Sequence, residues 1–167
     1  RQFGSSQQAV HFAAQGVISG ACDVVIAGGV ERMSRVPMWS NVPEGADPFG
    51  PTLAARYPEG LVPQGISAEL IAARWGLGRT DLDRFALTSH ERAHAAASAG
   101  LFERDIAPIK APGPDGAIVE VTADEGIRPD GTLEKLAGLR PAFEDPGFAS
   151  RFPEIGWHIT AANSSQI

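Results

Sequence analysis

The start of the chain decides the fold, and residues 1–37 read RQFGSSQQAVHFAAQGVISGACDVVIAGGVERMSRVP. Within this stretch apolar side chains recur at helical spacing, which predicts an amphipathic helix over residues 5–19. We expect Ser5 and Ser6 to cap its N-terminus, because their hydroxyl oxygens can accept hydrogen bonds from backbone N–H groups. Gly20 is expected to end the helix, since glycine readily adopts the left-handed conformation found there.

A short apolar run, Asp23-Val-Val-Ile-Ala27, follows this helix and ends at a pair of glycines. Continuous apolar runs of this length are typical of strands that are buried on both faces in α/β sheets. The single cysteine, Cys22, stands just before the run, so an intrachain disulfide and a multi-cysteine metal site are excluded. We expect Cys22 to be a small buried packing residue. Helix and strand together predict an α/β fold.

The N-terminus of the first helix is suited to acyl-transfer chemistry. A helix start leaves backbone N–H groups unpaired and carries partial positive charge, so it favours an anion. A cysteine there would have a lowered pKa, and the same donors could hold the oxyanion of a tetrahedral intermediate. Phe3 occupies this position, and a phenyl ring cannot act as a nucleophile. From spacing alone, Phe3 is interpreted as a core aromatic residue ahead of a helix.

Composition and charge narrow the class of protein. The chain has 167 residues, of which 43% are hydrophobic and 20% charged, as is ordinary for a globular protein. Its net charge of -6 argues against a nucleic-acid partner, which would need a basic face. No apolar run approaches the roughly 20 residues of a membrane span, so no membrane partner is expected. Because the chain begins at Arg1 and stops at Ile167 beside a strand-like segment, we expect a fragment of a larger enzyme.

After Pro37 the chain becomes rich in proline and glycine, and residues 39–65 are expected to form an ordered loop. Two helices are expected next: one over 68–75, capped by Ser67 and stapled by Ile66 and Ile71, and a longer one from its cap Thr80 to Gly100. A hairpin is then expected to pair 106–110 with 117–122. A short helix over 133–138, capped by Thr132, and a strand-like segment at 157–161 complete the expected elements. The longer helix is expected to bury an apolar stripe made of Leu82, Phe85, Ala86, Ala93, Ala96 and Ala97.

A pair of histidines on the longer helix raises the question of a metal site. His90 and His94 are separated by four residues, which places both on one helix face, and they frame the pattern His-Glu-Arg-Ala-His. The pattern predicts zinc only with a third ligand and a cleft. No residue nearby supplies a third ligand at a recognised spacing, so no metal is expected.

Ordered blocks along nearly the whole chain resemble the thiolase family. The opening stretch is similar to the thiolase nucleophile helix, in which a cysteine stands where this chain has Phe3, and its form is similar to thiolases that act on bulky or steroid-type acyl chains. The other blocks follow in the family's order: QGISAE at 64–69, DRFA at 83–86, GLFERDI at 100–106, DEGIR at 124–128, TLEKL at 132–136, LRPAF at 139–143 and ITAANSS at 159–165.

The resemblance implies a partial thiolase-like layered α/β fold with an inserted CoA-binding loop domain. It implies that residues 1–38 carry the nucleophile helix and strand of the N-terminal catalytic half. Residues 39–150 would form the loop domain, and residues 151–167 would return into the catalytic half.

The resemblance also implies which side chains bind coenzyme A, here a substrate, so no cofactor is expected. The implied contacts are Arg128 at the nucleotide end, Leu139, Ala142 and Phe143 along the adenine and pantetheine groove, and Ser165 on pantetheine, with Lys135 as an additional candidate. An arginine fork suits phosphate and an aromatic face suits adenine. Without the resemblance, Arg128 is equally well a surface charge, and Leu139 and Phe143 are core residues. Pro63-Gln64 departs from the His-Met pair of many biosynthetic thiolases, which puts one pantetheine contact in doubt.

The implied activity is acyl transfer between a 3-ketoacyl-CoA and CoA through a cysteine acyl-enzyme, by thiolytic cleavage or the reverse Claisen condensation. The catalytic histidine and second cysteine of the family lie beyond Ile167, and none of the four histidines matches that histidine's motif. With Phe3 at the nucleophile position we expect this chain alone to be inactive. The family implies a cytoplasmic homodimer or homotetramer. Two alternatives stay open: a non-catalytic CoA- or acyl-binding paralogue in which Phe3 is native, and a member of the ketosynthase branch.

Overall fold

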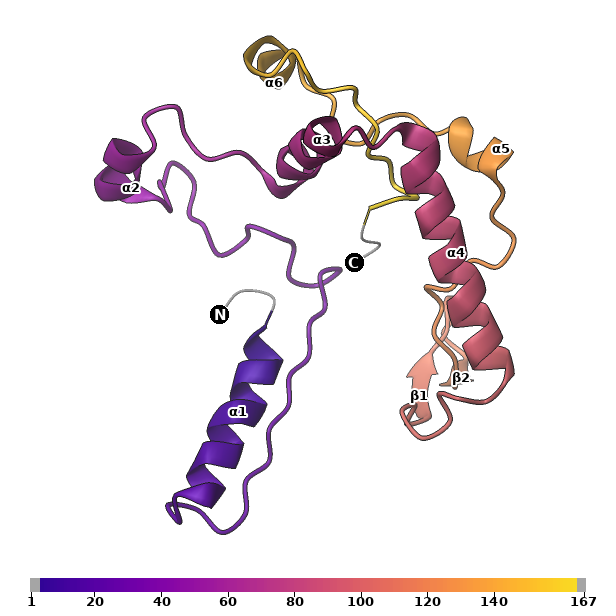
Figure 1. Ribbon diagram of the computed structural model, residues 1–167. Helices are drawn as coiled ribbons and strands as arrows, with labels where there is room; N and C mark the ends of the chain where they lie inside the picture. The colour runs from indigo at the N-terminus through magenta and orange to yellow at the C-terminus, as the bar shows by residue number, and fades with distance from the viewer. Residues whose placement is uncertain (1–3, 165–167) are drawn as a thin grey trace. The chain divides into compact units, whose positions relative to one another are not determined.

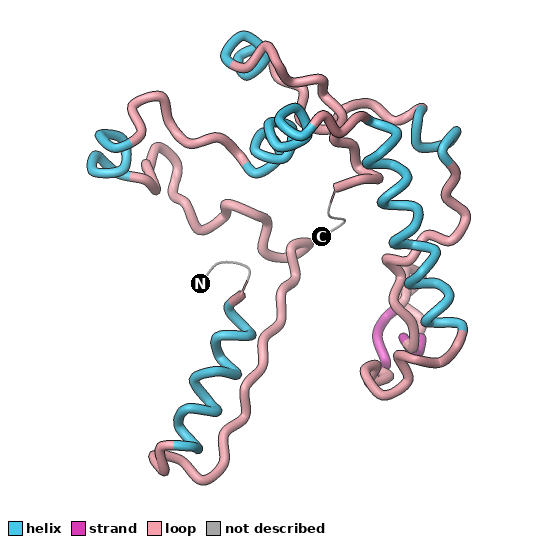
Figure 2. The backbone as a smooth tube through the Cα atoms, in the orientation of Figure 1, coloured by secondary structure: helices cyan, strands magenta, loops and turns pink. Residues whose placement is uncertain are grey.

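A computed structural model describes residues 4–164 and divides the chain into two compact units, Arg1–Gly60 and Leu61–Ile167. Six helices and two strands lie among the described residues, in the order shown in Figure 1. Figure 2 shows how much of the backbone between them is loop. Each unit is described by itself.

The first unit contains α1 (Ser5–Ile18) and α2 (Gly50–Arg56). The expected first helix is confirmed, and Gly20 follows it with a φ of 73°, a left-handed conformation that glycine adopts without strain. The expected caps are wrong. Gly4 is the N-cap and no side chain accepts a hydrogen bond there, because the helix already begins at Ser5.

The buried strand expected at 23–27 is also wrong for the described structure. Residues 24–32 form no strand and run back beside α1, as Figure 1 shows, with Val24 85% and Ile26 95% exposed. A strand exists through hydrogen bonds to a neighbouring strand, and no described residue supplies that neighbour. Cys22 is exposed, against expectation, because the segment that it precedes is uncovered.

The loop expected over residues 39–65 contains a helix that the sequence analysis missed. This helix, α2, has Pro51 in its first turn, where the missing N–H costs nothing because those groups have no acceptor within the helix. At seven residues it is too short for a periodic apolar pattern to reveal it.

The second unit begins with two longer helices, α3 (Gln64–Trp75) and α4 (Arg79–Ser98). Both are confirmed, but neither begins where expected. Pro63 is the N-cap of α3, so Ser67 lies inside the helix, where its hydroxyl donates to the Pro63 carbonyl; Ile71 is exposed and makes no staple. Gly78 is the N-cap of α4, and its N–H donates to Asp81 at 3.0 Å, so Thr80 does not cap.

The buried face of α4 differs from the expected apolar stripe. Phe85 is 79% exposed, whereas Asp83 is 2% exposed and faces inward. Asp83 is held inside because Arg79 and Asn163 donate hydrogen bonds to its carboxylate, which compensates its loss of water. Hydrophobicity alone could not predict that a carboxylate sets the inward face.

The remaining elements are β1 (Ile109–Pro112), β2 (Ile118–Val121), α5 (Leu133–Ala137) and α6 (Pro146–Arg151). The hairpin is confirmed, with β1 antiparallel to β2 and Ile109 opposite Val121. The expected cap of α5 is confirmed as well, since the Thr132 hydroxyl accepts from the Lys135 N–H at 3.2 Å. The helix α6 was missed; Asp145 caps it by accepting from two backbone N–H groups.

The core of the described structure is small and lies in the second unit. Its buried apolar side chains come from α3, α5 and the segment 155–160, and they are Ile66, Ala72, Leu136, Ile155 and Ile159. Three buried polar residues accompany them: Glu69 on α3, Asp83 on α4 and Thr160 in the segment 155–160. The segment expected to be strand-like at 157–161 forms a single antiparallel bridge, from Thr160 to Pro141.

Candidate functional site

The N-terminus of α1 presents backbone donors. The first bond of the helical ladder runs from Gln8 N–H to the Gly4 carbonyl at 2.9 Å, so the N–H groups of Ser5, Ser6 and Gln7 precede it. No acidic residue lies in the first turn to neutralise the positive end of the helix dipole. This geometry suits an oxyanion. Phe3, at the position that the resemblance assigns to the nucleophile, lies outside the described residues.

The glycine pair after the apolar run approaches the same helix end. A Cβ on Gly29 would lie 2.5 Å from the Ser6 hydroxyl oxygen, whereas a Cβ on Gly28 would meet nothing within 4 Å. A side chain at position 29 would therefore force the Ser6 hydroxyl to rotate away, whereas the Ser6 Cβ at 3.7 Å is an ordinary contact. Because glycine has no side chain, the backbone of Gly29 can lie beside the start of α1.

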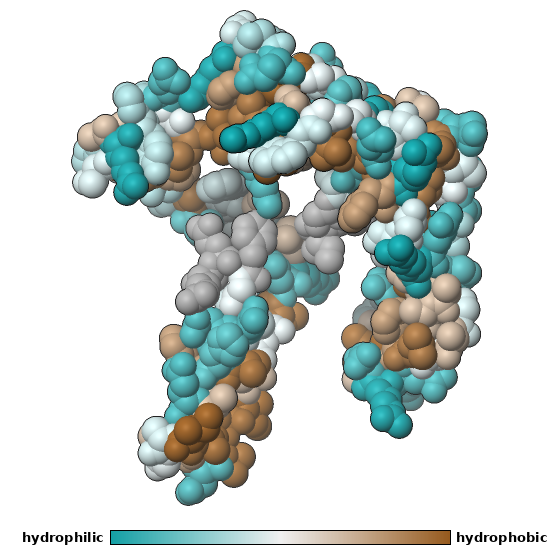
Figure 3. Space-filling model, in the orientation of Figure 1, coloured by the Kyte–Doolittle hydropathy of each residue, from teal (hydrophilic) through white to brown (hydrophobic). Residues whose placement is uncertain are grey.

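An apolar groove runs between α1 and the segment that returns beside it. Its volume is about 350 Å³, and it is lined by Ala9, Phe12, Ala13, Gly16, Cys22, Val25, Ile26, Ala27 and Gly28. In Figure 3 hydrophobic atoms gather along α1 and this segment. The groove contains one polarizable group, the Cys22 thiol, and no charged side chain. It offers apolar contact and no means of chemistry by itself.

In the second unit, the segment that holds the CoA candidates Leu139, Ala142 and Phe143 lies beside the start of the block at 159–165. The Ala142 N–H donates to the Ile159 carbonyl at 2.8 Å, and Pro141 bridges to Thr160. Arg79 at the start of α4 donates to the Leu139 carbonyl at 3.1 Å and to the Leu136 carbonyl. Residues 139–143 are therefore fixed between α4 and the segment 158–160.

Phe143 lies against the first turn of α3. A Cβ placed on Gly65 would come within 2.4 Å of the Phe143 ring, so the ring packs directly on the glycine backbone. Phe143 is 37% exposed and Leu139 is 39% exposed, and both keep apolar surface available to a ligand. An exposed aromatic face beside a glycine is a suitable surface for a flat ring such as adenine.

Arg128 and Lys135 are held by other contacts. The Arg128 N–H donates to His90 Nδ1 at 3.2 Å, which ties the loop before α5 to α4. The Lys135 ammonium donates to the Asp130 carbonyl at 2.7 Å and to its carboxylate at 3.3 Å. This hydrogen bond from Lys135 lowers the pKa of Asp130. The pKa of Glu134 is lowered by its own backbone N–H and by Thr132.

The structure thus brings Leu139, Ala142 and Phe143 together on one segment beside residues 158–160. It places Arg128 on a separate loop against α4 and Lys135 on α5. Ser165 lies outside the described residues. Among residues 4–164 there is no group of three or more His, Cys, Asp or Glu side chains that could hold a metal ion, and His90 instead accepts the Arg128 bond.

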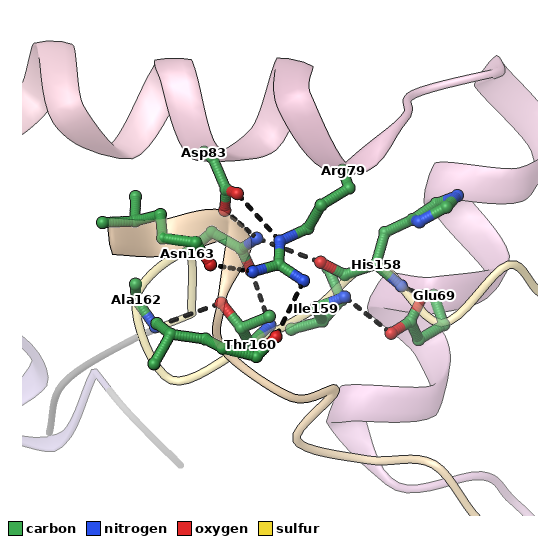
Figure 4. A network of polar contacts seen from close by, with 10 residues as sticks. Glu69, Arg79, Asp83, His158, Ile159, Thr160, Ala162 and Asn163 are labelled. Atoms are coloured by element: carbon green, nitrogen blue, oxygen red, sulfur yellow. Dashed lines mark hydrogen bonds and ion pairs between the residues drawn. The ribbon is translucent and has the colours of Figure 1, made fainter. Parts of the chain in front are cut away.

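Four polar residues that hold these segments were not predicted from the sequence: Glu69, Arg79, Asp83 and Asn163 (Figure 4). A signal for Glu69 was present. It lies three residues after Ile66 and three before Ala72, so a carboxylate stands on the buried face of α3. Charged groups are rarely buried without specific partners, so this spacing indicated a bonding role.

No helix within residues 4–164 combines the length and apolarity needed to cross a membrane.

Comparison with known proteins gives concordant matches. The family model described as "Thiolase, N-terminal domain" matches residues 1–167. A 3-ketoacyl-CoA thiolase of Shewanella frigidimarina is 44% identical over 167 residues, which are 100% of this chain and 40% of that protein. A steroid 3-ketoacyl-CoA thiolase of Mycobacterium tuberculosis is 42% identical over 176 residues, 100% of this chain and 39% of the relative.

Two solved structures are also similar. The dimeric peroxisomal thiolase of Saccharomyces cerevisiae matches with a TM-score of 0.75 and 36% identity, over 100% of this chain and 39% of that one. The human mitochondrial 3-ketoacyl-CoA thiolase matches with a TM-score of 0.69 and 29% identity, over 95% of this chain and 39% of that one. The chain therefore spans about two fifths of the length of these relatives.

Proposed function

Because this chain belongs to the thiolase family and matches its N-terminal domain throughout, we propose that the protein carrying it derives from enzymes that transfer acyl groups between a 3-ketoacyl-CoA and CoA, and that a cysteine at position 3 restores this activity. The direction is thiolytic cleavage or the reverse Claisen condensation, through a cysteine acyl-enzyme. This chain contributes the start of α1, where backbone donors face a developing oxyanion, and a surface for coenzyme A in its second unit.

The observation that carries the CoA assignment is the pairing of residues 139–143 with the segment 158–160. Two sequence blocks that the family resemblance assigns to one ligand are joined by a backbone hydrogen bond and a bridge, although they are distant in sequence. We propose that Leu139, Ala142 and Phe143 line the adenine and pantetheine groove. Arg128 and Lys135 would meet the nucleotide phosphates, and Ser165 would bond pantetheine.

Phe3 limits what this polypeptide can do. A phenyl side chain has no lone pair to attack the 3-keto carbon and no proton to exchange, so the acyl-enzyme cannot form at this position. We propose that the chain binds CoA and is inactive in thiolysis. The relative named for 3-ketoacyl substrates and the relative named for steroid 3-ketoacyl substrates have nearly the same sequence identity to this chain, 44% and 42%. Both kinds of acyl chain are therefore compatible with the proposal.

The experiment that tests this proposal restores the nucleophile. Phe3→Cys in the full-length protein is expected to raise CoA-dependent cleavage of a 3-ketoacyl-CoA by on the order of a thousandfold or more, because it supplies the missing nucleophile. Phe3→Ala is the matched control, since it removes the ring without adding a thiol. Cleavage by the cysteine variant that does not exceed cleavage by the alanine variant would contradict the enzyme assignment.

A second candidate function follows from Phe3 itself: a non-catalytic thiolase-like protein that binds CoA or acyl-CoA. Calorimetric titration of the unaltered protein with CoA separates the two candidates when it is combined with the Phe3→Cys assay. CoA binding without any gain of cleavage favours the binding protein.

One relative is described as dimeric, and we propose that the protein carrying this chain is a homodimer or homotetramer.

A further inference from the structure

A buried carboxylate on α3 holds the backbone of the segment 158–160. Glu69 is fully buried, and each of its two oxygens accepts one backbone hydrogen bond: from His158 N–H at 2.8 Å and from Ile159 N–H at 2.7 Å. Figure 4 shows the carboxylate directed at these two successive amides. Hydrogen bonds to an ionised carboxylate are stronger than neutral ones, so this pair fixes the segment firmly.

A second carboxylate, on α4, holds the end of the same segment through Asn163. Asp83 Oδ1 accepts from Asn163 Nδ2 at 2.8 Å, and Asn163 Oδ1 accepts from Thr160 N–H at 2.8 Å. The same Asn163 amide donates to the His158 carbonyl at 3.0 Å. Asn163 therefore closes the turn from 158 to 163 from inside and joins it to α4.

Arg79 connects this anchor to the other proposed CoA segment. Its Nε lies 2.8 Å from Asp83 Oδ2, and its remaining nitrogens donate to the carbonyls of Leu136 and Leu139. One network of polar contacts thus holds both segments, the one at 139–143 and the one at 158–163.

The backbone just before the anchored segment is strained. Trp157 has a φ of 55°, which a residue with a side chain adopts rarely. Strain of this kind persists only where surrounding contacts hold it, and the Glu69 bonds begin at the next residue. A network that served only to stabilise the core could be replaced by apolar packing, whereas this one fixes a backbone that begins with the left-handed Trp157 and lies beside the proposed groove residues 139–143.

We propose that Glu69, Asp83 and Asn163 are positioning residues for the pantetheine arm of coenzyme A. They act through the backbone of residues 158–163, which lies beside the proposed groove residues 139–143, and they do not themselves touch the ligand. This inference rests on the proposed function, since it assigns a role within the same CoA site. The nucleotide end is served by a separate anchor, the bond between Arg128 and His90.

The test compares two ligands on the full-length protein by calorimetry. CoA carries the pantetheine arm, and adenosine 3′,5′-bisphosphate lacks it. In Asn163→Asp a carboxylate replaces the amide donor and is repelled by the Asp83 carboxylate and the His158 carbonyl. In Glu69→Gln the new amide NH₂ group faces one of the two backbone N–H groups, which then has no acceptor. Each variant is expected to weaken CoA binding about tenfold, because a charge-assisted bond that orders the segment is lost, and to leave the affinity for the bisphosphate unchanged. Glu91→Gln on the exposed side of α4 is the matched control.

Rescue provides the second measurement. In Asp83→Asn combined with Asn163→Asp the donor and acceptor are exchanged, so a hydrogen bond between the two positions forms again. The double variant is expected to bind CoA more tightly than either single variant, and this comparison decides the matter if a single variant folds poorly.

Four results would overturn the inference. The first is an equal loss for CoA and the bisphosphate, which indicates a general structural role, and the second is no loss of CoA affinity in any variant. The third is a failure of the unaltered protein to bind CoA, which would refute the proposed function itself and the inference with it. Selective loss for the Glu91→Gln control would equally contradict the assigned positions.

Discussion

At the scale of single residues, Gly65 determines where the Phe143 ring can lie. The ring packs on the first turn of α3 at a distance that leaves no room for a Cβ at position 65, since that atom would come within 2.4 Å of ring atoms Cγ and Cδ1. The glycine has no left-handed backbone requirement here. Its role is the close approach of an aromatic side chain, and this links a helix start to a proposed CoA contact.

We therefore predict that Gly65→Ala destabilises the second unit. The added methyl forces Phe143 out of its position, and overpacking of this kind costs about 1–3 kcal/mol of the free energy of unfolding. Denaturation with urea, followed by circular dichroism, measures the loss. Gly138→Ala is the matched control, because a Cβ there would lie 3.6 Å from its nearest neighbour, an ordinary contact. Equal unfolding midpoints for the two variants would refute the packing argument.

Residue-level expectations succeeded where one side chain makes a local bond. Thr132 caps α5 as expected, because its hydroxyl and the Lys135 N–H are three residues apart. Ser67 and Thr80 have the same capping chemistry but lie inside helices that begin earlier, at backbone caps formed by Pro63 and Gly78. The position of a helix start in these cases depends on how the whole helix packs.

At the scale of elements, the short helices of the second unit depend on their caps. The five-residue α5 is too short to be stable alone, so it relies on the Thr132 bond and on the burial of Leu136. The longer α4 has twenty residues and does not depend on a single end contact.

This difference leads to a paired prediction. Thr132→Ala is expected to lower the free energy of unfolding by about 1 kcal/mol, because the Lys135 N–H loses its acceptor. Thr80→Ala is expected to change it by less than about 0.5 kcal/mol or to stabilise slightly, since alanine is the better helix former inside α4. Thermal unfolding of both variants beside the unaltered protein provides the measurement. A larger cost at position 80 would restore Thr80 as the cap.

Four of the six helices and the hairpin could be predicted from the sequence, whereas the short helices α2 and α6 were missed and the strand expected at 23–27 is wrong. Helical bonds and a hairpin close within a short stretch of chain, so local spacing reveals them. A strand buried on both faces needs partners that are distant in sequence, and no described residue pairs with this one. Its apolar pattern remains, and its side chains are exposed.

At the scale of the whole molecule, apolar surface is the dominant feature. In the first unit the large side chains of Ile26 and Val30 are 95% and 98% exposed, and Val24 is 85% exposed. Contiguous apolar surface of this kind favours association.

We predict that the 167-residue chain, expressed alone, associates in solution and binds a dye specific for exposed apolar surface. Light scattering after size exclusion measures the association. Replacing Ile26 and Val30 by lysine is expected to reduce it at least about twofold, because two charges interrupt the exposed apolar surface that drives association. Gln15→Lys, an added charge on an exposed position of α1, is the control and is expected to have a smaller effect. A monodisperse monomer with cooperative unfolding would contradict the prediction.

The sequence by itself determined the family, the first helix, the hairpin and the cap of α5, because ordered motifs and local spacing contain that information. It also showed that Phe3 stands where the resemblance places a nucleophile. Only the tertiary structure brought residues 139–143 beside 158–160 and turned Glu69 and Asp83 inward to hold them. The physical reason is that a buried carboxylate is stable only where distant backbone and side-chain donors meet it, and folding alone assembles those donors.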